Sequence, residues 1–189
     1  MHQFLKKSVW SFSSVLIKMI SGIVINKFFA VRFGASGITI LAHFQNLVSM
    51  VTQIPNDGVN RGIIRYWSNQ AINNEEKQRL LVSGLFLNVI IFILSVLSVY
   101  VFRDFVFRYF NVSLISLPVS WVLIISLFIY ILNLFFLSVI LSFQYIRQYA
   151  ILNILGATIT GLVVIAGTGT HNLNLALTSF LAGSAINFL

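Results

Sequence analysis

Apolar residues fall along the chain in six long runs, separated by short polar or glycine-containing segments. The runs cover roughly residues 9–31, 38–64, 80–102, 119–143, 150–166 and 173–189. A membrane-spanning helix needs about 20 predominantly apolar residues. The runs are continuous rather than alternating, which argues against an outer-membrane barrel. The pattern therefore predicts an all-α fold, a polytopic transmembrane helical bundle with about six spans that forms one transmembrane domain over residues 1–189.

The segments between the runs predict the connections of this bundle. Glycines in Phe33–Gly37 indicate a tight reversal. Short turns are predicted at 144–148 and 167–172, and longer exposed loops at 67–79 and 103–118.

Composition supports a membrane location. The chain is 58% hydrophobic and 8% charged, with a mean hydropathy of +0.95, whereas average soluble domains carry about 25% charged residues. After Arg108 a single formally charged side chain, Arg147, remains. A soluble surface with so few charges would not be solvated, so the chain belongs in a bilayer. Each charged side chain inside an apolar run is then a candidate for a functional role.

The formal net charge of +8 comes from 12 Lys and Arg against 4 Asp and Glu. It fits the excess of basic residues in cytoplasmic loops better than binding of a nucleic acid, because the basic residues do not form aromatic-interleaved clusters. With the N-terminus in the cytoplasm, the inner side holds Lys6, Lys7, Arg61, Arg65, Lys77, Arg79 and Arg147. The outer side holds Arg32, Arg103 and Arg108. This imbalance predicts a cytoplasmic N-terminus.

The second apolar run carries a polar stripe. At about 100° per residue, one sector of the helix gathers His43, Asn46, Ser49, Gln53, Asn56, Asp57, Asn60 and Arg61. Pro55 and Gly58 predict a kink or local break, and Pro55 can shift the phase of the residues after it. Unsatisfied polar groups facing lipid cost several kcal/mol. The stripe is therefore a polar seam between helices or a wall of a water-filled cavity, and its many amides and charges favour the cavity.

Three charged side chains in the first two runs are candidates for contact with a transported substrate or ion. Asp57 and Arg61 are four residues apart, so they can pair on one helix face. The pair either neutralises itself near the interface or exchanges partners during transport. Lys18 lies near the middle of its run, too deep to reach the interface easily. It faces a lumen or pairs with Asp57, and both interpretations place the first two spans side by side.

Small residues four positions apart predict close helix packing in the last two runs. The pairs are Ala157 with Gly161 and Ser179 with Gly183. Catalysis receives little support, because the sequence contains no nucleophile elbow, no phosphate-binding glycine loop and no cluster with metal-ligand spacing. No carboxylate follows Asp104 and there is no cysteine. We expect no enzymatic activity, no metal site and no cofactor.

Several motifs together resemble a known family. A first span with internal lysines leads into Phe33–Gly37 (FGASG), then Ala42–Asn46 (AHFQN), Gly58–Tyr66 (GVNRGIIRY) and later Leu141–Tyr149 (LSFQYIRQY). This succession resembles the Wzx-type polysaccharide flippases of the multidrug/oligosaccharidyl-lipid/polysaccharide exporter superfamily. The resemblance extends over the whole chain and matches the N-terminal half of such a protein. It implies one lobe of a two-lobed, MATE-like exporter fold that works by alternating access.

The resemblance also implies a substrate and a location. Such flippases move undecaprenyl-diphosphate-linked oligosaccharides from the cytoplasmic to the periplasmic leaflet of the bacterial inner membrane, in biosynthesis of O-antigen, lipopolysaccharide or related polysaccharides such as enterobacterial common antigen. Lys18 and Arg61 would compensate the diphosphate. Sugar hydroxyls would bind the amides of Asn46, Gln53, Asn56 and Asn60. Further partners would be membrane lipids, a polysaccharide polymerase and a chain-length regulator, and no nucleic acid.

Two other functions are compatible with the pattern. A multidrug or cation antiporter of the same superfamily would need buried acidic groups, and Asp57 is the one carboxylate within a predicted span. A membrane-embedded glycosyl or acyl transferase would need carboxylates that the second half of the chain lacks. The sixth apolar run is still apolar at Leu189, which predicts a chain truncated within that span. Such a fragment should not transport alone.

Overall fold

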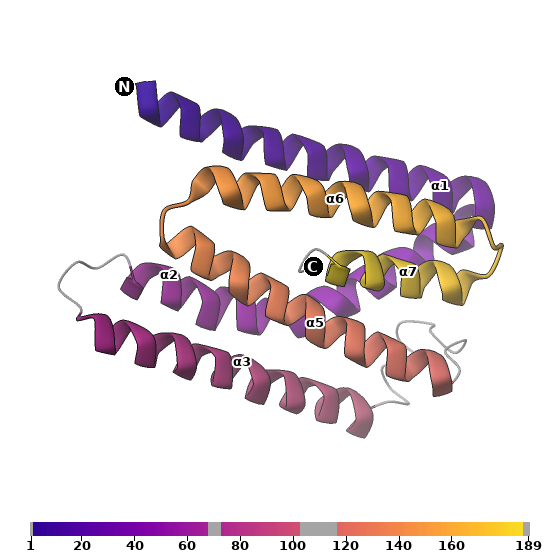
Figure 1. Ribbon diagram of the computed structural model, residues 1–189. Coiled ribbons are helices and arrows are strands. Elements are labelled where there is room, and N and C mark those ends of the chain that lie inside the picture. The colour runs from indigo at the N-terminus through magenta and orange to yellow at the C-terminus, as the bar shows by residue number, and fades with distance from the viewer. Residues whose placement is uncertain (1, 68–72, 103–116, 187–189) are drawn as a thin grey trace.

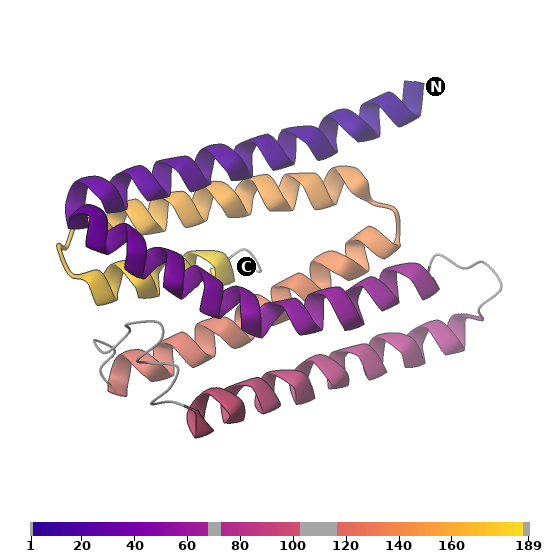
Figure 2. The ribbon, with the colours of Figure 1, turned by 180° about the vertical axis from the view of Figure 1, so that it is seen from behind.

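The computed structural model describes residues 2–67, 73–102 and 117–186, and helices form nearly all of this part. In chain order the elements are α1 (His2–Ile54), a π-helix η1 (Pro55–Asn60), α2 (Arg61–Trp67), α3 (Asn74–Val101), α5 (Leu117–Ser142), α6 (Ile146–Thr168) and α7 (Leu173–Ile186). Figures 1 and 2 show them as an elongated bundle. The predicted all-α fold is confirmed.

Four stretches of helix are long and apolar enough to cross a membrane, and a shorter apolar helix follows them. The four are Ser8–Trp67, Glu75–Val101, Trp121–Ser142 and Ile146–Thr168, and the shorter one is Leu173–Ala185. Since each of the four longer stretches has the length that the hydrocarbon core requires, they indicate a multi-pass membrane protein.

The first stretch doubles back at Gly34. This residue has φ 68° and ψ −162°, inside an otherwise helical segment. Only glycine adopts this backbone region without strain. The reversal predicted at Phe33–Gly37 is therefore confirmed, and it divides α1 into a first limb (residues 2–33) and a second limb (residues 35–54). Both views show the two limbs diverging from the reversal (Figures 1 and 2).

The first limb lies against α6, α6 lies against α7, and α7 lies against α5. The expectation that the first two spans lie side by side holds only near the reversal, where side chains of both limbs share the core. Beyond it the limbs diverge, and α6 packs along the first limb (Figure 1). The apolar core of the bundle contains side chains from both limbs and from α3, α5, α6 and α7. Among them are Phe29, Leu41, Phe44, Phe92, Ile131, Val164 and Leu181.

Small residues form the close contacts that the sequence predicts. The Ser21 hydroxyl donates to the carbonyl of Ala157 at 2.8 Å, and a Cβ added to Gly161 would lie 3.2 Å from Ser21 Oγ. A Cβ on Gly183 would lie 2.8 Å from the Cα of Thr160. The backbones of α1, α6 and α7 approach so closely because these positions lack bulky side chains.

Two predicted connections are too long. Helix α3 begins at Asn74, so the later part of the predicted 67–79 loop is helical, with Glu75 and Glu76 in the first turn where the helix dipole favours acidic side chains. Helix α6 begins at Ile146, because Gln144 has φ 60° and reverses the chain within a few residues. The rest of the first loop (68–72) and most of the loop holding Arg103, Asp104 and Arg108 lie outside the described residues, as do the side chains of Lys6 and Lys7 and residues 187–189.

The connections alternate between the two ends of the bundle. Helix α2 ends, α3 begins, α5 ends and α6 begins at the end where the chain itself begins (Figure 1). We call this the N-terminal end of the bundle. Arg65 in the last turn of α2, Lys77 in the first turn of α3 and Arg147 in the first turn of α6 lie there. The Gly34 reversal and the α6–α7 turn lie at the opposite end.

Candidate functional site

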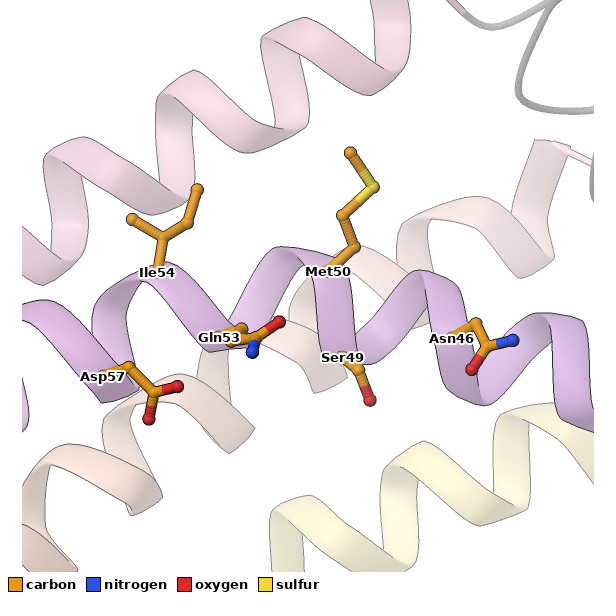
Figure 3. Close-up of a pocket in the computed structure, with 6 residues that line it drawn as sticks. All are labelled: Asn46, Ser49, Met50, Gln53, Ile54 and Asp57. Carbon is orange, nitrogen blue, oxygen red and sulfur yellow. The ribbon is translucent and has the colours of Figure 1, made fainter.

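An open groove runs along the second limb of α1 into the π-helix. Its volume is about 620 Å³, and it is lined by Asn46, Ser49, Met50, Gln53, Ile54 and Asp57. Figure 3 shows Asn46, Ser49 and Asp57 on one edge, Gln53 between the edges, and the apolar Met50 and Ile54 on the other. The groove therefore has a polar edge and an apolar edge on a single helix.

The second limb is amphipathic because its core-facing and groove-facing residues alternate at helical spacing. Leu41, Phe44, Val48 and Val51 are buried in the core, whereas Asn46, Ser49, Gln53 and Asp57 are exposed. Steps of three and four residues keep each set on its own face. From Asn46 to Asp57 the stripe lines an open surface, so it is not a closed seam between the helices that the structure describes.

Asp57 and Arg61 form the predicted ion pair. Arg61 Nη2 lies 3.0 Å from Asp57 Oδ1, and the two side chains are 73% and 38% exposed, respectively. Exposed pairs contribute little to stability, since water screens them. The pair therefore places a guanidinium and a carboxylate at one end of the groove, where either can take another partner. Asp57 pairs with Arg61 rather than with Lys18.

The structure brings together some of the predicted site residues and separates others. Asn46, Gln53 and Asp57 line the groove, and Arg61 lies next to it through the ion pair. Asn56 is half-buried within the π-helix and does not line the groove. Lys18 is exposed on the first limb, which diverges from the second. A substrate-binding role for any of these residues stays a prediction.

Asn60 points away from the groove. It is 1% exposed, and its Oδ1 accepts a hydrogen bond of 3.1 Å from Asn88 Nδ2 on α3. The cause is the π-helix: the Arg61 N–H donates to the carbonyl of Asn56, five residues earlier. One extra residue in a turn shifts the phase by about 100°. The predicted irregularity at Pro55 is thus confirmed, and it removes Asn60 from the stripe.

Asn88 is the residue that sequence reasoning did not assign to the site. It is 0% exposed, and it also donates to the carbonyl of Gly84 at 2.9 Å. The sequence does indicate that Asn88 is unusual, because it is the one amide side chain in the apolar run at 80–102. A lone buried amide requires a partner, but the sequence does not show which helix supplies it.

Aromatic and basic side chains interact at the two ends of the bundle. At the N-terminal end, Lys77 Nζ lies 5.7 Å from the ring centroid of Trp67, and Arg147 Cζ lies 5.5 Å from that of Trp10. These are cation–π distances. At the opposite end Arg32 Nη1 and His171 Nε2 are 3.1 Å apart, which ties the end of the first limb to the α6–α7 turn. In the described ranges no group of three or more His, Cys, Asp or Glu residues could hold a metal ion.

Comparison with known proteins finds distant sequence similarity to flippases. The lipid III flippases of Escherichia coli (strain K12) and Shigella flexneri are each 28% identical to the chain over 74 residues. The aligned segment is 39% of this chain and 18% of each flippase. No family profile matches the chain, and no solved structure matches it. The similarity is partial, and it leads to flippases rather than to enzymes.

Proposed function

We propose that the chain forms a transmembrane lobe of a flippase that moves lipid-linked oligosaccharides across the bacterial inner membrane. It has about six spans, a cytoplasmic N-terminus and no enzymatic activity. The substrate class is an undecaprenyl-diphosphate-linked repeat unit for O-antigen, lipopolysaccharide or a related polysaccharide such as enterobacterial common antigen. The partial similarity to the lipid III flippases supports this proposal.

The observation that carries the proposal is the polar edge of the groove within an apolar bundle. A diphosphate sugar head group cannot cross hydrocarbon unaided, because its charges and hydroxyls would lose their water. A groove that is open along one side offers polar contacts to the head group while the polyprenyl tail stays in lipid. The exposed amides of Asn46 and Gln53 suit this task, since each has donors and an acceptor for sugar hydroxyls.

Arg61 is the proposed diphosphate contact. A guanidinium binds phosphate oxygens through two parallel hydrogen bonds. To do so Arg61 exchanges Asp57 for the substrate, and their pair is exposed enough that the exchange is inexpensive. Lys18 and Asn60 lie outside the groove and take no direct part.

The orientation follows from the charge distribution. Arg65, Lys77 and Arg147 lie at the N-terminal end of the bundle, and basic residues are retained on the cytoplasmic side. The N-terminal end is therefore the cytoplasmic end in this proposal, which is where a lipid-linked repeat unit would enter the groove.

Cysteine protection tests the proposal. The chain contains no cysteine, so Gln53→Cys and Thr170→Cys each introduce a single thiol at an exposed position, the second in the α6–α7 turn outside the groove. The variants are reconstituted in liposomes and treated with a membrane-impermeant maleimide, with and without an undecaprenyl-diphosphate-linked oligosaccharide. We expect the lipid to slow labelling at position 53 and not at position 170. Adding Arg61→Ala should weaken protection by about 10-fold, the lower range for a charged hydrogen bond.

Two results would contradict the proposal. Equal labelling at position 53 with and without the lipid would show that the groove does not bind the head group. Protection by a hydrophobic cation instead of the lipid would favour an antiporter.

A further inference from the structure

A second, smaller pocket lies between the second limb of α1, α5 and α7. Its volume is about 240 Å³, below the range of about 300–1,000 Å³ that is usual for drug-sized ligands, so it suits one small ring. Most of the side chains that line it are polar: Gln45, Ser49, Thr52, Tyr130 and Ser184. Among the residues that the structure describes, no charged side chain lines this pocket. A charged ligand would lose its water here without gaining a counter-charge, which favours a neutral polar ligand.

The hydroxyls of Thr52 and Ser184 have already used their donors. Thr52 Oγ1 donates to the Val48 carbonyl at 2.9 Å. Ser184 Oγ donates to the Phe180 carbonyl, also at 2.9 Å. A hydroxyl has one donor and two acceptor lone pairs, so both oxygens can only accept a hydrogen bond from a ligand. The Gln45 amide adds two donors and an acceptor. The pocket therefore suits a ligand with several hydroxyl groups better than a diphosphate or an acyl chain, which have no donor at neutral pH.

Two aromatic rings, those of Tyr130 and Phe180, also line the pocket. The core holds Phe180 in place, because its ring packs edge-on against the buried Phe44, with centroids 6.4 Å apart and an interplanar angle of 75°. The face of a sugar ring consists of C–H groups, which pack on an aromatic ring while the hydroxyls at the edge of the sugar form hydrogen bonds. Aromatic walls with acceptors beside them are therefore suited to one sugar ring.

The pocket adjoins the groove. Ser49 lines both, and Figure 3 shows its side chain pointing away from Met50, toward the side on which α7 lies. Ser49 is eight residues before Asp57, which is about 12 Å at the rise of an α-helix. A glycan whose diphosphate lies at the Asp57–Arg61 pair would extend along the groove to Ser49, where one of its rings can enter the pocket.

We propose that this pocket is a sugar-binding subsite, which takes one ring of the glycan while the rest of the head group lies in the groove. The link to a lipid-linked glycan rests on the proposed function. The ability to bind a sugar does not, because it follows from the side chains of the pocket itself.

Thiol labelling tests the subsite. Ser184→Cys replaces a hydroxyl by a thiol at a partly exposed position that lines the pocket and not the groove. Its reaction with a small water-soluble thiosulfonate is timed in the purified chain in detergent. Three probes are added in turn: an undecaprenyl-diphosphate-linked oligosaccharide, the same glycan released from its lipid, and undecaprenyl diphosphate without sugar. At saturation we expect both forms of the glycan to slow labelling by 5-fold or more, and undecaprenyl diphosphate to leave the rate unchanged.

Two further substitutions in the Ser184→Cys chain show whether the pocket side chains bind the glycan. Gln45→Leu removes the amide and should raise the glycan concentration needed for half-protection by about 5-fold, the effect of one neutral hydrogen bond. Tyr130→Phe keeps the ring, removes the hydroxyl and should act in the same direction, so it serves if Gln45→Leu fails to fold. Gln148→Leu is the matched control, since Gln148 is an exposed glutamine on α6 outside the pocket. It should leave the concentration unchanged.

The outcomes separate the subsite from the proposed function. Protection by the lipid-linked oligosaccharide at position 53 but not at position 184 would leave the proposed function standing and overturn the subsite. Protection by the released glycan at position 184, with none by the lipid at position 53, would support the subsite and contradict the proposed function. A thiol at position 184 that does not react without any probe would show a sealed pocket and overturn the subsite. Equal protection by undecaprenyl diphosphate, or half-protection that neither Gln45→Leu nor Tyr130→Phe changes, would do the same.

Discussion

Two regions of the bundle contain polar side chains but handle them differently. Between the first limb, α6 and α7, small residues and hydroxyls form a closed contact, here called the seam, in which Gly161 and Gly183 let backbones approach. Along the second limb, amides and charges form the open groove. Both regions lie in the same apolar bundle. They differ in the type of polar side chain that they contain, and not in the hydropathy of the surrounding residues.

The difference lies in where hydrogen bonds can be completed. A serine or threonine hydroxyl bonds a carbonyl three or four residues earlier in its own helix, as Ser138, Ser142, Thr168 and Ser179 do. Such residues can be buried anywhere on a helix. An amide has two donors and an acceptor oxygen, so one carbonyl of its own helix satisfies only part of it. Gln53 remains exposed, whereas the buried Asn60 and Asn88 bond each other across two helices.

The most destabilising substitution should be one at the seam. In Gly183→Ala the new Cβ would lie 2.8 Å from the Thr160 Cα, so α6 and α7 must separate. We expect a loss of about 1–3 kcal/mol in the free energy of unfolding, measured by thermal unfolding in detergent. Gly22→Ala is the control: it has no atom within 4 Å of its new Cβ and should gain up to about 1 kcal/mol. Equal changes in both variants would show that the seam is not closely packed.

A smaller effect is expected at the end of the bundle opposite the N-terminal end. Arg32→Ala removes the contact with His171 and should lower the free energy of unfolding by about 0.5–1.5 kcal/mol. Lys27→Ala, at another exposed cation of the first limb, serves as the control. An Arg32 variant as stable as the Lys27 variant would mean that the α6–α7 turn is held by the seam alone.

The smallest effect on stability is expected in the groove. Arg61→Ala breaks the exposed pair with Asp57 and should change the free energy of unfolding by about 0.5 kcal/mol or less. Thermal unfolding of this variant beside Gly183→Ala measures the contrast directly. A loss of unfolding free energy comparable to that of Gly183→Ala would mean that the pair belongs to the packed interior. The groove and the seam would then not differ in the way described.

Features that depend on near neighbours in the chain could be predicted. The reversal at Gly34, the irregularity at Pro55 and the Asp57–Arg61 pair are confirmed, because each follows from the chemistry of a few adjacent residues. The lengths of the connections were overestimated. Polar residues of the first turn of α3, such as Glu75, are solvated whether they are helical or not, so polarity does not separate helix from loop there.

The order of the residues alone is enough to indicate an α-helical chain with membrane-length spans and a polar stripe on one of its helices. Which part of that stripe is open depends on how the helices pack. Helical periodicity placed Asn60 with Gln53, whereas the π-helix and the buried amide of Asn88 turn it inward. Helix packing also places Lys18 on a limb that lies against α6 and not against the second span. Periodicity is a property of a single helix, whereas the partner of a buried amide depends on which other helix packs beside it.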